Sequence, residues 1–225
     1  MASTKQRANT EAVYAQVRAD VLGGVHRPGE RLKFSALCER YGASVSVVRE
    51  ALSRLAEQGL VVSEPRIGFA VRAMTVDDLR DLTMTRIELE TLALRKAIER
   101  GDVDWESQIV AAHHRLERTA MFTDDDAPPR VSDDWEVAHA AFHGSLLSGC
   151  DSPWLLGIAT TLRDAAEFYR RWSQIVEPDR DACGEHRAIL EAALARDADL
   201  ATERLREHYQ RTADIVERGL TEQDD

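Results

Sequence analysis

Four histidines have the spacing and the surroundings of metal ligands. His139 and His143 lie one helical turn apart in the stretch H-A-A-F-H, and both fall on the apolar face of a predicted helix over 132–148. His186 and His208 fall on the apolar faces of two later predicted helices. A buried imidazole without a partner costs on the order of a few kcal/mol, and one shared divalent ion satisfies all four rings at once. The pattern therefore predicts a metal site inside a group of helices.

The donor set of this site indicates which ion it holds. Four neutral imidazoles favour Zn²⁺, with Ni²⁺ as a second candidate, over hard ions that prefer oxygen. They also leave the charge of the ion uncompensated, so that an open coordination position attracts an anion. The alternative is that each histidine is a satisfied core residue, which is the commoner case for any one of them alone. His113 has similar apolar neighbours, and we assign it no role.

Arginines on helix faces are the second feature that indicates binding. Arg86 lies on the apolar face of a predicted helix over 76–98, where a guanidinium needs a buried carboxylate or a ligand as its partner. Arg163 and Arg170 lie on a predicted helix over 152–174. A metal on one side and an arginine on the other suit a small carboxylate or dicarboxylate. The alternatives are a structural ion pair for Arg86, and solvated or dimer-interface roles for the other two.

The stretch over 42–61 predicts a helix that can read DNA. Its apolar face repeats at helical spacing through Val48, Ala51, Leu52 and Leu55. Ser44 suits the N-cap position, and Gly59 suits the left-handed position after the helix end. The polar face offers short hydroxyls and one arginine, namely Ser44, Ser46, Arg49 and Ser53. A helix that enters the DNA major groove by its first turns has this layout.

The neighbouring segments extend this helix to a winged helix-turn-helix domain over residues 1–74. The further expected elements are a helix from Asn9 or Thr10 to Leu22, a short helix closed by Gly42, and strands over 60–62 and 69–71. A wing loop that contains Arg66 and Gly68 joins the two strands. Residues before the first helix are expected to be frayed.

Residues 75–225 show no further strand pattern and predict an all-α helical bundle. The expected helices cover 76–98, 105–121, 132–148, 152–174, 180–195 and 198–218, with a loop from Thr123 to Arg130. The whole chain is therefore expected to be mainly α, with a DNA-binding head and a helical body.

The charges of the chain are distributed unevenly between these two parts. Residues 1–73 hold 11 Lys and Arg against 7 Asp and Glu, whereas the remainder holds 18 against 33 within a net charge of −11. A mildly basic head on an acidic body permits the head to meet phosphates. The chain has no apolar run of membrane-spanning length and three scattered cysteines, Cys38, Cys150 and Cys183, which favours a cytoplasmic protein with reduced thiols.

The head resembles the DNA-binding domain of GntR-type bacterial transcription regulators. The resemblance covers roughly residues 10–73 and is carried by R-P-G-E-R-L, V-R-E-A-L-S-R-L-A-E-Q-G-L-V and G-F-A-V. It implies that Arg49 contacts bases and that the wing, with Arg66 and Gly68, approaches the minor groove. Val45 stands where many members carry an arginine, which leaves the operator sequence open.

The body resembles the FCD type of effector-binding domain, which often dimerises. The resemblance implies that His143, His186 and His208 are metal ligands and that Arg86 meets the effector. His139 stands where these regulators place an acidic ligand. The stretch H-A-A-F-H-G-S-L-L-S-G-C-D-S-P-W-L-L resembles the glutarate-responsive, carbon-starvation branch, which implies a C4–C6 diacid such as glutarate as effector.

Three functions compete for this sequence. The first is a ligand-responsive regulator, in this family most often a repressor, that binds a palindromic operator as a homodimer. The second is a metal-dependent hydrolase, but Ala140 stands where H-E-x-x-H enzymes place the catalytic Glu, and Glu136 and Glu185 fall on the flanks of their helices. The third is a DNA-binding dimer whose metal is purely structural. We favour the first and expect the chain not to be an enzyme.

Overall fold

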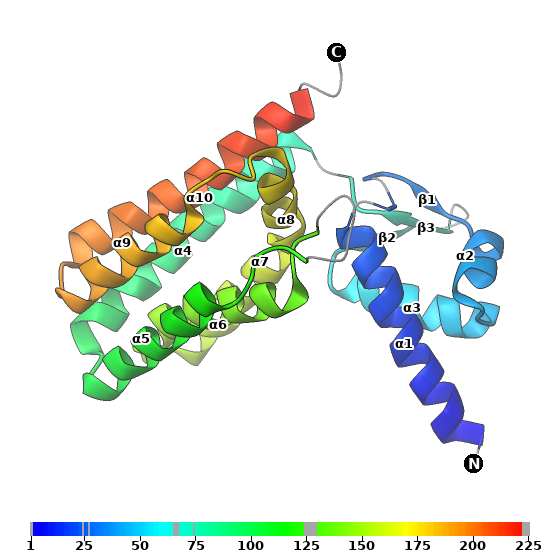
Figure 1. The fold of residues 1–225 in the computed structure, drawn as a ribbon, viewed down its shortest axis with the longest axis horizontal. Helices are drawn as coiled ribbons and strands as arrows, with labels where there is room; N and C mark the ends of the chain where they lie inside the picture. The colour runs from blue at the N-terminus through cyan, green and yellow to red at the C-terminus, as the bar shows by residue number, and fades with distance from the viewer. Residues whose placement is uncertain are drawn as a thin grey trace. The chain divides into compact units, whose positions relative to one another are not determined.

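The chain folds into two compact units, Met1–Thr75 and Val76–Asp225. The computed structural model describes residues 2–23, 25–26, 28–64, 68–73, 75–123 and 130–221. Within these ranges the protein has ten helices and one three-stranded sheet, as expected for a mainly α chain (Figure 1).

The first unit is a winged helix-turn-helix. Its elements are α1 (Ala2–Leu22), β1 (Arg31–Leu32), α2 (Phe34–Tyr41), α3 (Val45–Glu57), β2 (Val61–Glu64) and β3 (Gly68–Val71). The strands form an antiparallel sheet in the order β1-β3-β2, with Leu32 paired with Phe69 and Val61 with Val71. Helix α1 packs along α3, which also contacts α2 and β2.

Helix α3 forms where its sequence predicts it. The hydroxyl of Ser44 accepts a hydrogen bond from the backbone N–H of Val47, so that Ser44 is the N-cap. The predicted apolar face is fully buried, and Val47 is buried beside it. Gly59 follows the helix end with φ +73°, a left-handed conformation that favours glycine.

Two features of this unit differ from the sequence prediction. Helix α1 begins at Ala2, not at Asn9 or Thr10. The wing sheet has a third strand, β1, because the chain after the Pro28-Gly29 turn extends along β3. A two-residue strand with one buried side chain, Leu32, is too short to show an alternating pattern.

The second unit is a bundle of seven helices within the described residues. They are α4 (Val76–Arg100), α5 (Val103–Arg118), α6 (Asp133–Ser148), α7 (Pro153–Ala165), α8 (Glu167–Val176), α9 (Ala182–Leu194) and α10 (Ala198–Thr221). Helix α10 packs against α4, α8 and α9, and α5 packs against α6 and α9 (Figure 1). Most of the expected loop between α5 and α6, residues 124–129, lies outside the described ranges.

The single helix expected over 152–174 is wrong: the chain turns at Ala166 and forms two helices. Helix α7 buries only Ala159, whereas α8 buries most of its residues. The turn therefore redirects the chain from the surface into the bundle. No Pro or Gly marks it, so the helical pattern runs through it without a visible break.

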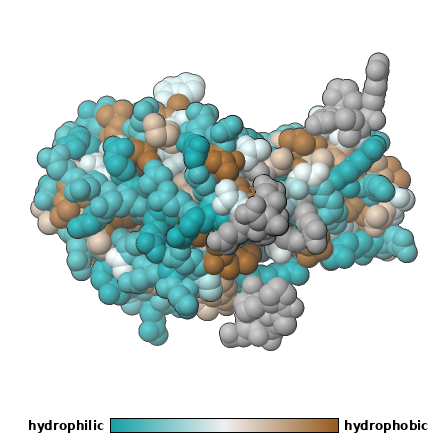
Figure 2. All heavy atoms as spheres, turned by 90° about the horizontal axis from the view of Figure 1, so that it is seen from above, coloured by the Kyte–Doolittle hydropathy of each residue, from teal (hydrophilic) through white to brown (hydrophobic). Residues whose placement is uncertain are grey.

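The face of the molecule drawn in Figure 2 is largely polar. On the face drawn in Figure 2, hydrophobic residues occur in small groups between hydrophilic ones. None of the helices in the described ranges is both long enough and apolar enough to cross a membrane.

The burial of Leu52 gives a test of the first unit. Leu52 is fully buried on α3, so Leu52→Ala is expected to lower the free energy of unfolding by about 2–5 kcal/mol. Chemical denaturation followed by circular dichroism measures the loss. The neighbouring exposed Ser53→Ala is the control and should change it by less than about 0.5 kcal/mol. Equal effects of the two substitutions would contradict the packing of α3.

Candidate functional site

The first unit presents the predicted DNA-reading residues on one exposed helix face. Ser46, Arg49 and Ser53 are all exposed on α3, opposite the buried apolar face. The hydroxyl of Ser44 lies 2.9 Å from that of Ser46. The residue that caps the helix therefore also places a second hydroxyl group next to Ser46 at the start of the helix.

The wing contributes a glycine with an unusual backbone. Gly68 opens β3 with φ +98°, a conformation that side-chain-bearing residues rarely adopt. No described heavy atom lies within 4 Å of where a Cβ would stand, so the constraint comes from the backbone and not from crowding. Arg66, the other predicted wing residue, lies outside the described residues.

The second unit brings the four predicted ligand histidines together. His139 and His143 come from α6, His186 from α9 and His208 from α10. All four rings are buried, and one nitrogen of each lies within 4.8 Å of the other three. Nitrogens that share one zinc lie roughly 3–4 Å apart, since Zn–N bonds are about 2.0–2.1 Å long. The four nitrogens therefore lie near one another, with separations of up to 4.8 Å that slightly exceed those around one bound ion.

The hydrogen bonds of these rings leave several of their nitrogens without a partner among the described residues. Among the described residues, no partner is found for Nδ1 of His139, Nε2 of His143 or Nε2 of His186. Each of these atoms is shielded from solvent, and buried nitrogens of this kind are normally satisfied. Three orphan nitrogens in one cluster fit a shared cation.

Tyr209 selects the tautomer of His143. The Tyr209 hydroxyl donates to Oε2 of Glu90 at 2.6 Å and lies 3.3 Å from Nδ1 of His143. Because its proton points to Glu90, the hydroxyl oxygen accepts from the Nδ1–H of His143. The lone pair of His143 is then on Nε2, the buried nitrogen for which no partner is found among the described residues.

Glu185 acts on His208 in the same way. Its Oε2 lies 2.7 Å from Nδ1 of His208, which leaves Nε2 of that ring with the lone pair. Arg180 holds the carboxylate from the other side, with Nε 2.9 Å from Oε1. The sequence placed Glu185 on the flank of its helix and gave no sign of Arg180, because the contact between α9 and α10 is not encoded in either helix alone.

Burial keeps the clustered rings neutral. It is the main cause that holds the pKa of His139, His143 and His186 well below the usual value, and the neighbouring imidazoles add to it. Burial also lowers the pKa of His208, against the opposing effect of Glu185. Burial raises the pKa of Glu185, but hydrogen bonds from Arg180 and His208 outweigh it and bring the value to about 2. Neutral rings are the form that binds a metal ion.

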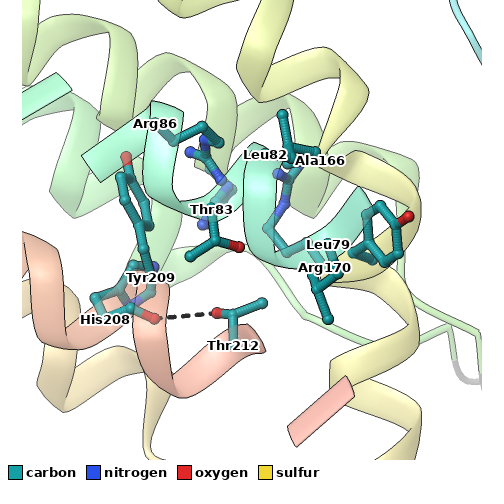
Figure 3. Close-up of a pocket in the computed structure, with 11 residues that line it drawn as sticks. Leu79, Leu82, Thr83, Arg86, Ala166, Arg170, His208, Tyr209 and Thr212 are labelled. Atoms are coloured by element: carbon teal, nitrogen blue, oxygen red, sulfur yellow. Dashed lines mark hydrogen bonds between the residues drawn. The ribbon is translucent and has the colours of Figure 1, made fainter. Parts of the chain in front are cut away.

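A narrow pocket adjoins the histidines and is shown in Figure 3. Two of the four histidines, His139 and His208, line it, together with Arg86 and Arg170. The other lining residues come from α4, from the α7–α8 turn with α8, and from α10: Leu79, Leu82, Thr83, Ala166, Tyr169, Tyr209 and Thr212. The pocket therefore joins two of the predicted effector arginines to the edge of the metal cluster.

Both pocket arginines already have a buried carboxylate partner. Arg86 lies 2.7 Å from Oε1 of Glu90 on the next turn of α4, with its guanidinium 4.0 Å from the centre of the Tyr209 ring. Burial acts to lower the pKa of Arg86, but Glu90 outweighs it and raises the value. Arg170 reaches Glu136 through Nε at 3.1 Å and Nη2 at 2.6 Å. Glu90 stands at i+4 from Arg86, and this spacing is the sequence signal for the pair.

Two further residues of the sequence analysis lie elsewhere. Arg163 is not among the described residues that line the pocket: its Nη1 contacts the backbone oxygen of Ala140 at 3.5 Å. His113 is buried on α5, where its ring packs against Phe142 and Nδ1 lies 3.6 Å from Glu117.

A winged helix-turn-helix joined to a helical unit whose pocket is lined by arginines and histidines is the arrangement expected of a DNA-binding transcription regulator. Comparison with known families agrees. The model of bacterial regulatory proteins of the gntR family matches residues 9–71, and the FCD domain matches residues 81–211. The chain therefore belongs to the GntR family of transcription regulators and carries an FCD effector domain.

Named relatives place the chain among regulators. It is 39% identical over 211 residues to the regulator BphR of Paraburkholderia xenovorans, covering 93% of this chain and 86% of the relative. It is 32% identical over 212 residues to the repressor GlaR of Escherichia coli, covering 92% and 95%. Both matched families and both relatives are transcription regulators, which agrees with the expectation that the chain is not an enzyme.

Solved structures show the same fold. The E. coli protein McbR/YncC superimposes with a TM-score of 0.66 at 20% identity, over 94% of this chain and 98% of that one. A GntR regulator from Rhodococcus sp. RHA1 gives 0.66 at 22% identity, over 93% and 97%.

The buried pair of Arg170 and Glu136 can be tested directly. Glu136→Ala leaves the guanidinium buried without a partner and is expected to lower the free energy of unfolding by about 3–5 kcal/mol. Replacing both residues, Glu136→Leu with Arg170→Met, should restore most of the loss in a chemical denaturation experiment. Glu203→Ala, at an exposed site on α10, is the control. If Glu136→Ala is as stable as this control, the pair of Arg170 and Glu136 is exposed to solvent in solution.

Proposed function

We propose that this regulator is a homodimeric repressor that binds a palindromic operator and releases it when a small carboxylate enters the pocket beside a bound metal. The observation that carries the proposal is the convergence of three orphan ring nitrogens with a pocket that contains two buried arginines. A purely structural metal would explain the nitrogens but not the polar pocket next to them.

The metal part of the proposal uses the residues already described. His139, His143, His186 and His208 would hold the ion, with Zn²⁺ favoured and Ni²⁺ second because all four donors are nitrogen. The ion supplies a positive charge that attracts an anion. Glu185 and Tyr209 keep His208 and His143 in the tautomers that such binding needs.

The charges of the pocket favour a diacid. Arg86 and Arg170 are each balanced by a buried glutamate, and the four imidazoles are neutral, so a divalent ion would leave the site two positive charges in excess. A dicarboxylate compensates that charge fully, whereas a monocarboxylate does not. We therefore propose a C4–C6 diacid such as glutarate as the effector.

The pocket walls also include the segment that leads to the DNA-binding unit. Leu79, Leu82, Thr83 and Arg86 line the pocket from the first turns of α4, and α4 begins directly after Thr75, where the first unit ends. The Tyr169 hydroxyl donates to Asp78 in the same turns at 2.8 Å. A ligand that shifts these contacts acts on the helix that is joined covalently to the DNA-reading unit.

The repressor proposal predicts that operator release requires both the metal and the acid. Fluorescence anisotropy with DNA from upstream of the chain's own gene measures operator affinity, first with metal-stripped and then with Zn²⁺-loaded protein. Glutarate or a related diacid should weaken binding of the loaded protein by 5- to 150-fold, and butyrate should have much less effect. His143→Ala should abolish the response, while the exposed His114→Ala should retain it.

Three outcomes of this titration would contradict the proposal. If no diacid changes the operator affinity of the Zn²⁺-loaded protein, the proposed effector is wrong. If the diacid weakens operator binding of the metal-stripped protein to the same extent, the metal has no part in the response. If the wild-type protein binds the upstream DNA no more tightly than a scrambled duplex, that DNA does not contain an operator for this protein.

The dimer part of the proposal is supported by the exposed side of α7. Trp154 is 85% exposed and Ile158, one turn later, is 45% exposed. The neighbouring α4 carries two further exposed apolar residues, Met84 and Leu92. An exposed tryptophan on an apolar helix is typical of a contact surface. We propose that a second copy of this chain covers it, since a palindromic operator needs two reading heads.

Substitution of Trp154 tests this surface. Multi-angle light scattering should give twice the chain mass of 25.2 kDa for the wild type and one chain mass for Trp154→Glu. Operator affinity of the variant should fall by at least about tenfold, because only one half-site is then held. Val103→Glu, at another exposed apolar position on α5, should remain dimeric. A dimeric Trp154→Glu variant would place the interface elsewhere.

A further inference from the structure

The arginine proposed to read bases does not extend freely into solvent. The guanidinium carbon of Arg49 lies 4.7 Å from the centre of the Phe34 ring, within the range of a cation–π contact. Arg49 is on α3, whereas Phe34 is the first residue of α2. The side chain is therefore held by the preceding helix of the motif and not by its own helix.

Phe34 is held in turn by the wing. Its ring meets the ring of Phe69 edge to face, with the centroids 6.0 Å apart and the planes at 89°. Phe69 is buried in β3, where it pairs with Leu32 on β1 and Ser63 on β2. A continuous contact thus runs from the centre of the wing sheet through Phe34 to the guanidinium of Arg49.

This arrangement affects how an arginine can read DNA. Arginine recognises guanine with two parallel hydrogen bonds, which require the guanidinium plane to have a defined orientation. A freely rotating side chain loses conformational entropy when it is fixed at an interface. An aromatic ring that already restricts Arg49 reduces that loss, and it does so for base recognition more than for phosphate contacts, which tolerate many orientations.

We infer that Phe34 is a positioning residue for operator recognition: its ring orients Arg49 and couples the reading helix to the wing. The inference rests on the proposed operator-binding function and on the base contact that the family resemblance implies for Arg49. It assigns to Phe34 a role in discrimination between sequences that does not require Phe34 to touch DNA.

A double-mutant cycle tests the inference. Anisotropy titrations compare Phe34→Leu, Phe34→Tyr, Arg49→Ala and the double variant Phe34→Leu/Arg49→Ala on the operator and on a scrambled duplex of equal length at the same salt concentration. Phe34→Leu should weaken operator binding roughly 2- to 5-fold, the range expected for an exposed cation–π contact, and leave scrambled binding unchanged. Phe34→Tyr, which keeps the ring, should behave as the wild type. In the Arg49→Ala background, Phe34→Leu should have no further effect.

The opposite results separate a structural role from a positioning role. Equal losses on both duplexes, or the same loss from Phe34→Leu with and without Arg49, would overturn the inference while leaving operator binding intact. A Phe34→Tyr variant as weak as Phe34→Leu would overturn it as well. Thermal melting of each variant shows whether the fold is kept, and Phe34→Met replaces Phe34→Leu in the cycle if the Leu variant does not fold. Wild-type protein without preference for the operator would instead overturn the proposed function.

Discussion

The burial of four imidazole rings in one helical unit is the constraint on which the rest of that unit depends. Each ring is polar and all four are buried, and a buried ring nitrogen needs a partner. On the outer side the partners are protein groups, Glu185 for His208 and Tyr209 for His143. These partners need partners of their own, Arg180 and Glu90. The polar interior is thus a connected set of contacts that ties α4, α6, α9 and α10 together.

Helical periodicity is sufficient to predict that the four histidines face the interior of the bundle. It is insufficient to predict which side chains form hydrogen bonds with their rings. Positions 139 and 143 share a face of any α-helix, and the apolar neighbours of the other two rings show which way they point. The contact of Glu185 with His208 depends instead on how α9 lies beside α10. A helical wheel places Glu136 on a flank, yet the residue is buried because α8 carries Arg170 over it. Contacts between helices decide such cases.

The winged helix-turn-helix was more fully predictable because its signals are local. The capping hydroxyl of Ser44 and the left-handed Gly59 act within one turn of the helix they delimit. The errors occurred where the local signal is absent. In the first unit, strand β1 is only two residues long. In the second unit, the turn between α7 and α8 is at Ala166, and alanine is also a common residue within helices. Both features are imposed by the neighbours against which they pack.

Tyr209 contacts both the Arg86–Glu90 pair on α4 and the histidine cluster. Its ring face lies on the guanidinium of Arg86, its hydroxyl donates a hydrogen bond to Glu90, and its hydroxyl oxygen accepts a hydrogen bond from the Nδ1–H of His143. A change of charge at the Arg86–Glu90 pair is therefore transmitted to His143 through the Tyr209 hydroxyl, and a change at His143 is transmitted to that pair in the same way. Under the proposed function, binding of the anion and binding of the metal ion would be thermodynamically linked through this one hydroxyl group, so that the affinity for either would depend on whether the other is bound.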